Sequence, residues 1–242
     1  MDKITFYVSN LSTSYDKFKV SGVSFQLNQG DIMGLVGRSG SGKSTVINTL
    51  VGLKRMDSGN VGVKINGSNV LLKNLIGYSP QGNSLYPFLT LEENLLTFGR
   101  LYKIRKKEMK ERMGFLLKKL DLQNSKKKRI VELSGGMQKR ADLAVTLIHD
   151  PRIIILDEPF TGLDISLQRF IWEFLKELSS EGKIIIISSH LLGDIQKNCN
   201  QFGLVYDGGF YGTEQLIRSI KDSKENSLEV YLEKLFTKGL VG

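Results

Sequence analysis

The chain has 242 residues, of which 40% are hydrophobic and 24% charged, a composition typical of a globular protein with one large domain or a domain and a subdomain. No apolar run reaches the ~18 residues that span a bilayer, Met1-Asp2-Lys3 does not open a signal peptide, and a single cysteine, Cys199, excludes an internal disulfide and a cysteine-based zinc cluster, so we expect a cytoplasmic protein. The formal charge of +9 favours an anionic partner: a nucleotide, a nucleic acid or an anionic membrane face.

The N-terminal residues predict strands of an antiparallel sheet. Apolar and polar residues alternate over residues 4–8 and again over 23–27, the period of strands with one buried face. Tyr15 lies in a polar segment between the two runs.

A glycine-rich loop comes next. The apolar run 32–36 predicts a strand, residues 47–51 begin a helical pattern, and Gly37-Arg38-Ser39-Gly40-Ser41-Gly42-Lys43-Ser44-Thr45 lies between them. This order is the context of a phosphate-binding loop, in which backbone N–H groups point at phosphate oxygens, Lys43 reaches the β- and γ-phosphates and Ser44 binds a magnesium ion. A turn that only caps a strand is the alternative, but chance gives the pattern in ~1% of chains this long. The loop therefore predicts a nucleotide site.

The middle of the chain changes from strand to helix. Residues 61–65 and 75–78 predict short strands, whereas Thr90 to Glu93 has capping-box spacing and residues 109–120 have helical periodicity. We expect residues 82–132 to be an all-helical insertion. Basic residues gather at 103–112 and 126–129, and a solvated helix face is the simplest interpretation of them.

A second anion site is predicted where the next helix begins. In Leu133-Ser134-Gly135-Gly136-Met137, Ser134 is the natural N-cap, and the two glycines leave backbone N–H groups accessible. An ordinary capped helix is the alternative, but paired glycines at a helix start reduce stability unless a ligand uses them.

Two further strands end in polar residues. The runs 153–156 and 184–187 predict buried strands joined by a helix over 167–178, and Asp157-Glu158 and His190 follow them. Ligands of open α/β sheets bind at the carboxyl ends of strands, so we expect Asp157 to hold metal, Glu158 to act as general base and His190 to face the nucleotide. His149 is interpreted as a charge at a helix end, and Cys199 as a buried apolar residue. A hairpin over 202–212 and a helix over 228–236 close the chain.

Together these motifs resemble the nucleotide-binding subunits of ATP-binding cassette (ABC) transporters. The resemblance rests on the loop Gly37–Thr45, Gln81, the signature Leu133–Met137, the run Ile153–Glu158, the loop Gly162-Leu163-Asp164 and His190, in that order over nearly the whole chain. It implies an α/β P-loop NTPase core with a mostly parallel sheet, an N-terminal antiparallel β-subdomain and an inserted all-helical subdomain. The implied parts are the ATP-binding core (1–81 and 133–212), the helical insertion (82–132) and a C-terminal helical tail (213–242).

The resemblance also implies roles, with ATP and Mg²⁺ as cofactors. Tyr15 would stack on adenine, Gln81 would touch magnesium and sense a membrane subunit, and His190 would contact the γ-phosphate. Ser134, Gly135, Gly136 and Asp164 would face the ATP of a second ABC subunit. Met137 departs from the glutamine most common there, so a contact of that side chain is lost or made differently.

The implied protein is an ATPase, peripheral on the cytoplasmic face of a membrane, that pairs with an integral membrane permease subunit and a second ABC subunit. The segment Gln81–Glu93, the methionine of the signature and the segment Ser227–Glu233 resemble the exporter class most. The alternative is a soluble ABC ATPase acting on nucleic acid, ribosomes or a cluster-assembly scaffold. Such proteins usually carry two cassettes in one chain, long coiled-coil arms or zinc motifs. This chain has one cassette, no sustained heptads and a single cysteine, so no nucleic acid partner is expected.

Overall fold

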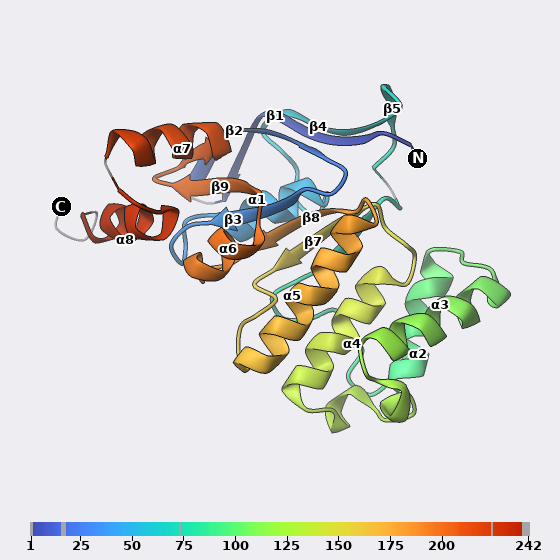
Figure 1. Cartoon of the computed structure of the whole chain (residues 1–242). Helices are drawn as coiled ribbons and strands as arrows, with labels where there is room; N and C mark the ends of the chain where they lie inside the picture. The colour runs from blue at the N-terminus through green and yellow to red at the C-terminus, as the bar shows by residue number, and fades with distance from the viewer. Residues whose placement is uncertain (1, 16–17, 73, 224, 239–242) are drawn as a thin grey trace. The chain divides into compact units, whose positions relative to one another are not determined.

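The computed structural model describes residues 2–15, 18–72, 74–223 and 225–238. The chain forms two compact units, Met1–Leu71 with Leu178–Gly242 and Leu72–Glu177 (Figure 1). Helix α5 (Ile165–Ser180) begins in the second unit and ends in the first. The division expected from the sequence, into an ATP-binding core, a helical insertion and a C-terminal tail, is a functional division and stays a prediction. Within the described ranges, the longest apolar helical stretches fall short of what crossing a bilayer requires.

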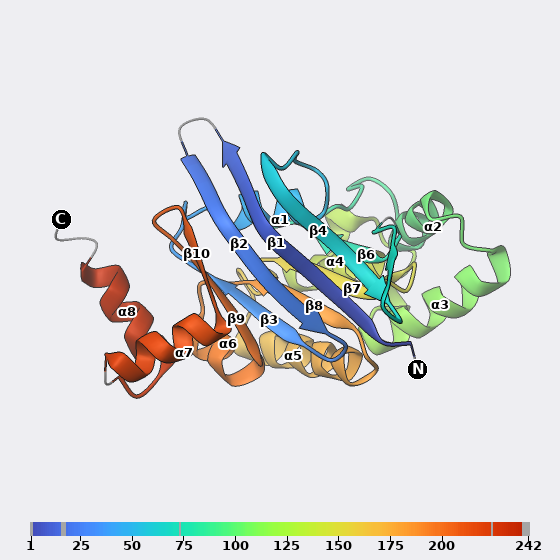
Figure 2. The same ribbon diagram turned by 90° about the horizontal axis from the view of Figure 1, so that it is seen from above.

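An antiparallel sheet forms one layer of the first unit, in the strand order β2-β1-β4-β5 (Figure 2). Its strands are β1 (Ile4–Tyr15), β2 (Phe18–Asn28), β4 (Ser58–Ile65) and β5 (Ser68–Val70). The two predicted N-terminal strands are confirmed, since Phe6 pairs with Leu27 and Val8 with Phe25. β1 nevertheless extends as far as Tyr15, through residues whose polarity concealed the strand. Thr13 is fully buried because the Thr49 hydroxyl hydrogen-bonds its hydroxyl at 2.9 Å.

Parallel strands carry the rest of the first unit. β3 (Ile32–Val36) pairs in parallel with β8 (Ile184–Ser188) and with β9 (Gln201–Tyr206), and β10 (Gly209–Gly212) closes an antiparallel hairpin on β9. Every residue of β3 and β8 is buried, which is why both strands were readable as continuous apolar runs. The helices of this unit are α1 (Lys43–Leu50), α6 (Leu192–Asn198), α7 (Thr213–Asp222) and α8 (Leu228–Lys238). Cys199 is only partly buried and packs toward Gly34 of β3.

The second unit contains the predicted helical segment. β6 (Ile76–Ser79) and β7 (Ile153–Asp157) pair in parallel. The helices are α2 (Leu91–Leu101), α3 (Lys106–Lys119) and α4 (Gly135–Leu147), with short 3₁₀ turns η1 (Gln123–Ser125) and η2 (Ile130–Glu132). The capping box at the start of α2 is confirmed: the Glu93 N–H donates to the Thr90 hydroxyl at 3.2 Å, and the Glu93 carboxylate accepts from the Thr90 N–H at 2.8 Å.

Side chains join α3 to the end of α4. Arg112 donates to the carbonyl oxygens of Ile148 at 2.6 Å and Leu147 at 3.0 Å. The His149 ring stacks on Tyr102 with centroids 3.6 Å apart, and its Nε2 lies 3.1 Å from the Ile76 carbonyl oxygen. Burial at this junction raises the pKa of Tyr102. His149 thus has a structural setting more specific than the helix-end charge expected from the sequence.

Candidate functional site

The glycine-rich loop joins β3 to α1 in the first unit. α1 begins at Lys43 with Gly42 as its N-cap residue at φ +101°, and its first turn carries no acidic residue to neutralise the positive end of the helix dipole. The buried Lys43 ammonium donates to the carbonyl oxygens of Gly37 at 2.8 Å and Arg38 at 3.2 Å. The Lys43 ammonium and the positive end of the α1 dipole therefore lie at the same loop. Two positive groups at one place favour the binding of an anion.

Close approaches explain two glycines of this loop. A Cβ on Gly37 would lie 2.5 Å from the Val205 carbonyl oxygen, and one on Gly42 would overlap the Phe18 ring. Gly40 meets nothing within 4 Å, but its φ of +78° favours glycine. The Ser41 hydroxyl oxygen is buried and has no hydrogen-bond partner among the described residues. The loop is tightly packed at both ends, open in the middle, and leaves one polar atom unsatisfied.

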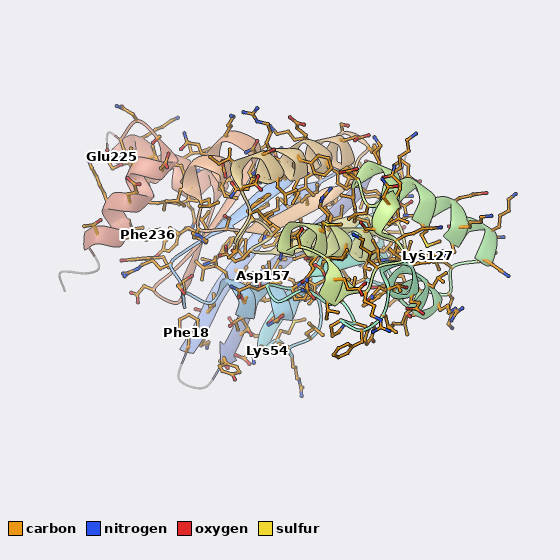
Figure 3. All side chains as sticks on the ribbon, turned by 90° about the horizontal axis from the view of Figure 1, so that it is seen from below. Phe18, Lys54, Lys127, Asp157, Glu225 and Phe236 are labelled. Carbon is orange, nitrogen blue, oxygen red and sulfur yellow. The ribbon has the colours of Figure 1, made fainter. Side chains whose placement is uncertain are left out.

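Two aromatic residues lie opposite each other at the end of the β1–β2 hairpin. Tyr15 pairs in register with Phe18, is 64% exposed, and has the Lys54 ammonium 5.4 Å from its ring centroid. Phe18, labelled in Figure 3, is partly buried. Its ring packs on Gly42 of the phosphate loop. The sequence analysis identified Tyr15 and missed Phe18. An aromatic residue three positions after Tyr15, at the start of the next strand, was the available signal.

His190 follows β8 in the same unit. Ser188 pairs with Leu35 of β3, and the Ser189 N–H donates to the Leu35 carbonyl oxygen at 3.2 Å. Leu35 lies two residues before Gly37, so His190 and the phosphate loop follow the carboxyl ends of neighbouring parallel strands. His190 is exposed. The structure thus brings this predicted residue to the edge of the sheet from which the loop departs.

The acidic pair ends β7 in the second unit. Asp157 is 3% exposed, whereas Glu158 is half-buried (Asp157 is labelled in Figure 3). Glu158 has φ +50°, a left-handed conformation that costs a non-glycine residue on the order of 1 kcal/mol or more. Phe160 stacks on Trp172 of α5 with centroids 4.6 Å apart, which anchors the chain just after the pair.

Charged groups of the second unit concentrate around this pair. Burial lowers the pKa of Lys139 on α4, and the carboxylates of Asp142, Asp157 and Glu158 partly offset that shift. Burial raises the pKa of Tyr78 to about 12, and Asp157 and then Asp142 add to the shift. Neither Lys139 nor Asp142 was a candidate from the sequence, although each is a charged residue in a helix with an apolar buried face. The charges of these acids therefore act on Lys139 of α4 and on Tyr78 of β6.

The segment that carries Gln81 is fastened to α4 by Asp142. Gln81 itself is exposed in a turn directly after β6. The fully buried Asp142 carboxylate accepts hydrogen bonds from the Ser79 hydroxyl and, at 2.8 Å each, from the N–H and hydroxyl of Ser84. These contacts bracket Gln81 on both sides, so its backbone is fixed to the signature helix while its side chain stays accessible.

The predicted second anion site is the N-terminus of α4. Ser134 is the N-cap, and its hydroxyl accepts from the Met137 N–H at 3.3 Å. A Cβ on Gly135 would meet nothing within 4 Å, whereas one on Gly136 would lie 2.6 Å from Leu167 Cδ2. Packing therefore explains Gly136 but not Gly135. The first turn of α4 contains no acidic residue, so its dipole is also available to an anion.

Asp164 lies at the start of α5, where its Oδ1 accepts from the Leu167 N–H at 2.9 Å. This bond caps the helix, a role that the sequence analysis did not assign to it. Because Leu167 also packs on Gly136, the structure brings the predicted Asp164 loop close to the N-terminus of α4.

Known proteins agree with this geometry. A family model described as ABC transporter matches residues 20–161. The chain is 35% identical over 224 residues to the Nod factor export ATP-binding protein I of Rhizobium etli, covering 91% of this chain and 68% of that protein. It is 36% identical over 203 residues to the linearmycin resistance ATP-binding protein LnrL of Bacillus subtilis, covering 82% of this chain and 65% of that one. The chain thus spans about two thirds of these relatives.

Solved structures show the same fold. An ATP binding subunit of an ABC transporter superposes with a TM-score of 0.82 at 26% identity, over 96% of this chain and 99% of that one. An inward-facing, putative metal-chelate type ABC transporter gives a TM-score of 0.75 at 25% identity, over 87% of this chain and 83% of that one. The predicted fold class, an α/β P-loop NTPase core, is confirmed. The chain belongs to the ABC transporter family, as an ATP-binding subunit with ATPase activity.

Proposed function

We propose that this chain binds ATP with Mg²⁺, hydrolyses it between two ABC subunits, and thereby drives export through a separate membrane permease. The observation that carries the proposal is the presence of two anion-binding helix N-termini in one chain, at Lys43 and at Ser134, in different units. A site that takes one of these helix N-termini from each of two subunits would use both.

The phosphate loop fits a nucleotide. The buried Ser41 hydroxyl has no partner in the described part of the chain, and the backbone at Gly40 is open to a ligand. The proposed phosphate contacts are the whole loop: Gly37, Arg38, Ser39, Gly40, Ser41, Gly42, Lys43, Ser44 and Thr45. Tyr15 stacks on adenine, and Phe18 steadies the loop beneath it.

The remaining roles follow the family. In the family, the residues at the positions of Ser44, Gln81 and Asp157 bind the magnesium ion; here they would hold it through side-chain oxygen atoms, and the ion would supply positive charge to the phosphate oxygens. Glu158 accepts the proton of the attacking water, and His190 contacts the γ-phosphate. Ser134, Gly135, Gly136 and Asp164 face the nucleotide of the partner subunit.

Two exposed aromatic residues support a contact surface for the permease next to Gln81. Phe88 is 76% exposed and Tyr86 47%, both in the segment between Gln81 and α2. Backbone bonds tie this segment to the residues before the signature: Val131 N–H donates to Pro87 O and Ile130 N–H to Leu89 O, both at 3.1 Å. Gln138 of α4 in turn donates to Ile130 O at 3.1 Å. A displacement of Tyr86 and Phe88 would therefore be transmitted to the start of α4 through these hydrogen bonds.

The first test is ATP turnover by Glu158→Gln. Loss of the general base lowers ATP hydrolysis by roughly 10²–10⁴-fold, while the phosphate contacts and ATP affinity are kept. Lys43→Ala is the matched variant, because it instead weakens nucleotide binding. Near-normal ATPase activity of Glu158→Gln, or unchanged ATP affinity of Lys43→Ala, would contradict the proposed site.

The second test is purification of the tagged chain from detergent-solubilised native membranes. A stoichiometric polytopic membrane protein is expected, and Tyr86→Ser with Phe88→Ser should release it without changing basal ATP hydrolysis. Recovery only with ribosomes or a soluble scaffold would assign the same ATP chemistry to the alternative function and refute the transport role.

A further inference from the structure

A cavity of about 770 Å³ lies between α2 and α3 in the second unit. The two helices run side by side in Figures 1 and 2, and all of the cavity's lining residues belong to residues 92–126. Its volume is within the ~300–1,000 Å³ of small-molecule sites. It is separate from the nucleotide motifs, and neither the ATP chemistry nor the proposed permease contact uses it.

The floor of the cavity is apolar and flexible. Met109, Met113 and Leu117 follow one another at four-residue spacing on α3, and Leu96 of α2 and Ile104 complete the floor. Unbranched methionine side chains adapt to irregular apolar ligands more readily than branched ones. Such a floor suits an alkyl chain.

Cations surround this floor. Arg100 of α2, Lys106 and Lys110 of α3, and Lys126 line the cavity, with Glu92 as the acidic lining residue. Lys126 lies 3.8 Å from Glu92, so that pair is largely neutral. Arg100, Lys106 and Lys110 leave a positive excess at an apolar cavity, which selects an anionic group attached to an apolar body.

Glycine at position 114 leaves space in this wall. Gly114 lines the cavity within α3, and a Cβ built on it would meet nothing within 4 Å. Its dihedral angles are helical, so no turn or close approach requires glycine here, and glycine in a helix interior costs about 1 kcal/mol relative to alanine. Because Gly114 is exposed, a larger side chain at this position would extend into the open space of the cavity.

We infer that the α2–α3 cavity binds a single-chain anionic amphiphile of the long-chain fatty acid type. The alkyl chain lies on the methionine floor, and the carboxylate meets Arg100, Lys106 and Lys110.

The test uses the purified full chain and a dansyl-labelled undecanoic acid, displaced by unlabelled fatty acids below their micelle concentration. Binding of one molecule per chain is expected. From octanoate to tetradecanoate, affinity should rise about fourfold per methylene and then level off when the cavity is full. The alcohol of equal length should bind more weakly than the carboxylate.

Two variants at one position locate the site. Gly114→Leu fills the cavity without a backbone clash and should abolish binding of the dansyl probe, whereas Gly114→Ala makes the same helix-propensity gain with little filling and should bind nearly as the wild type does. Binding that survives in Gly114→Leu, or is lost equally in both variants, would overturn the assignment.

Charge variants test the carboxylate contact. Lys106→Gln with Lys110→Gln should weaken dodecanoate binding roughly threefold to tenfold but not dodecanol binding. Lys107→Gln with Lys118→Gln removes the same charge from α3 outside the cavity and should leave both unchanged. Two outcomes would refute the inference. Binding to anionic vesicles without binding of monomeric fatty acid would assign this face to a membrane surface. Loss of the permease from Gly114→Leu without any amphiphile binding would assign it to a protein.

Discussion

Removing the Asp142 carboxylate should destabilise the second unit strongly. Asp142→Ala leaves three donors without their acceptor: the Ser79 hydroxyl, and the N–H and hydroxyl of Ser84. Each hydrogen bond to a charged group contributes ~1.5–3 kcal/mol, and loss of one partner of a buried charged cluster costs ~3–5 kcal/mol because these terms do not add. We expect the free energy of unfolding to fall by about 3–5 kcal/mol.

The variant Asp142→Asn should lose less stability than Asp142→Ala, because it keeps part of the hydrogen bonding. In Asp142→Asn, the amide oxygen still accepts from Ser84, and the Ser79 hydroxyl can reverse and accept from the amide NH₂, so the cost should be about 1–2 kcal/mol. At ~2–4 °C per kcal/mol for a chain of this size, thermal unfolding should shift down by about 6–20 °C for Asp142→Ala and 2–8 °C for Asp142→Asn. Equal shifts for the two variants, or an alanine shift below 2 °C, would refute the reasoning.

Three further predictions concern single features of the fold. Thr90→Ala removes the α2 cap and should lower the free energy of unfolding, measured in urea, by about 1 kcal/mol. Hydrogen bonds from the Thr90 backbone and then from its side chain lower the pKa of Glu93. The loss of stability should therefore persist above pH 4.5 and shrink as the pH falls below it. Gly42→Ala should weaken ATP binding in isothermal titration more than Gly40→Ala, because both have positive φ but only Gly42 packs on Phe18. Arg112→Ala should lower thermal stability by about 1–3 kcal/mol, with only partial rescue by lysine, which lacks the planar fork that reaches two carbonyls.

The sequence predicted what depends on local pattern. The fully buried strands were visible as apolar runs, the phosphate loop as glycines between a strand and a helix, and the α2 cap as Thr90 with Glu93. Each of these is encoded within twenty consecutive residues or fewer, so no knowledge of distant contacts was needed to find it.

Features that depend on distant partners were missed. The extension of β1 to Tyr15 relies on Thr13 meeting Thr49 of α1, and the buried position of Asp142 relies on serines some sixty residues earlier in the chain. In both cases a polar residue suggested exposure, whereas a partner far along the chain makes burial possible. α6 was missed for another reason: it has seven residues, too few for the helical period to repeat.

The backbone hydrogen bonds between residues 87–89 and 130–131 have a consequence for how ABC subunits come to bind different permeases in evolution. Main-chain hydrogen bonds do not depend on which side chains are present. The aromatic residues at positions 86 and 88 are therefore free to be exchanged for others that match a different membrane protein, while the mechanical connection to α4 is inherited unchanged. A transplant of this short segment between two ABC subunits should transfer the choice of permease and leave ATP hydrolysis with the recipient.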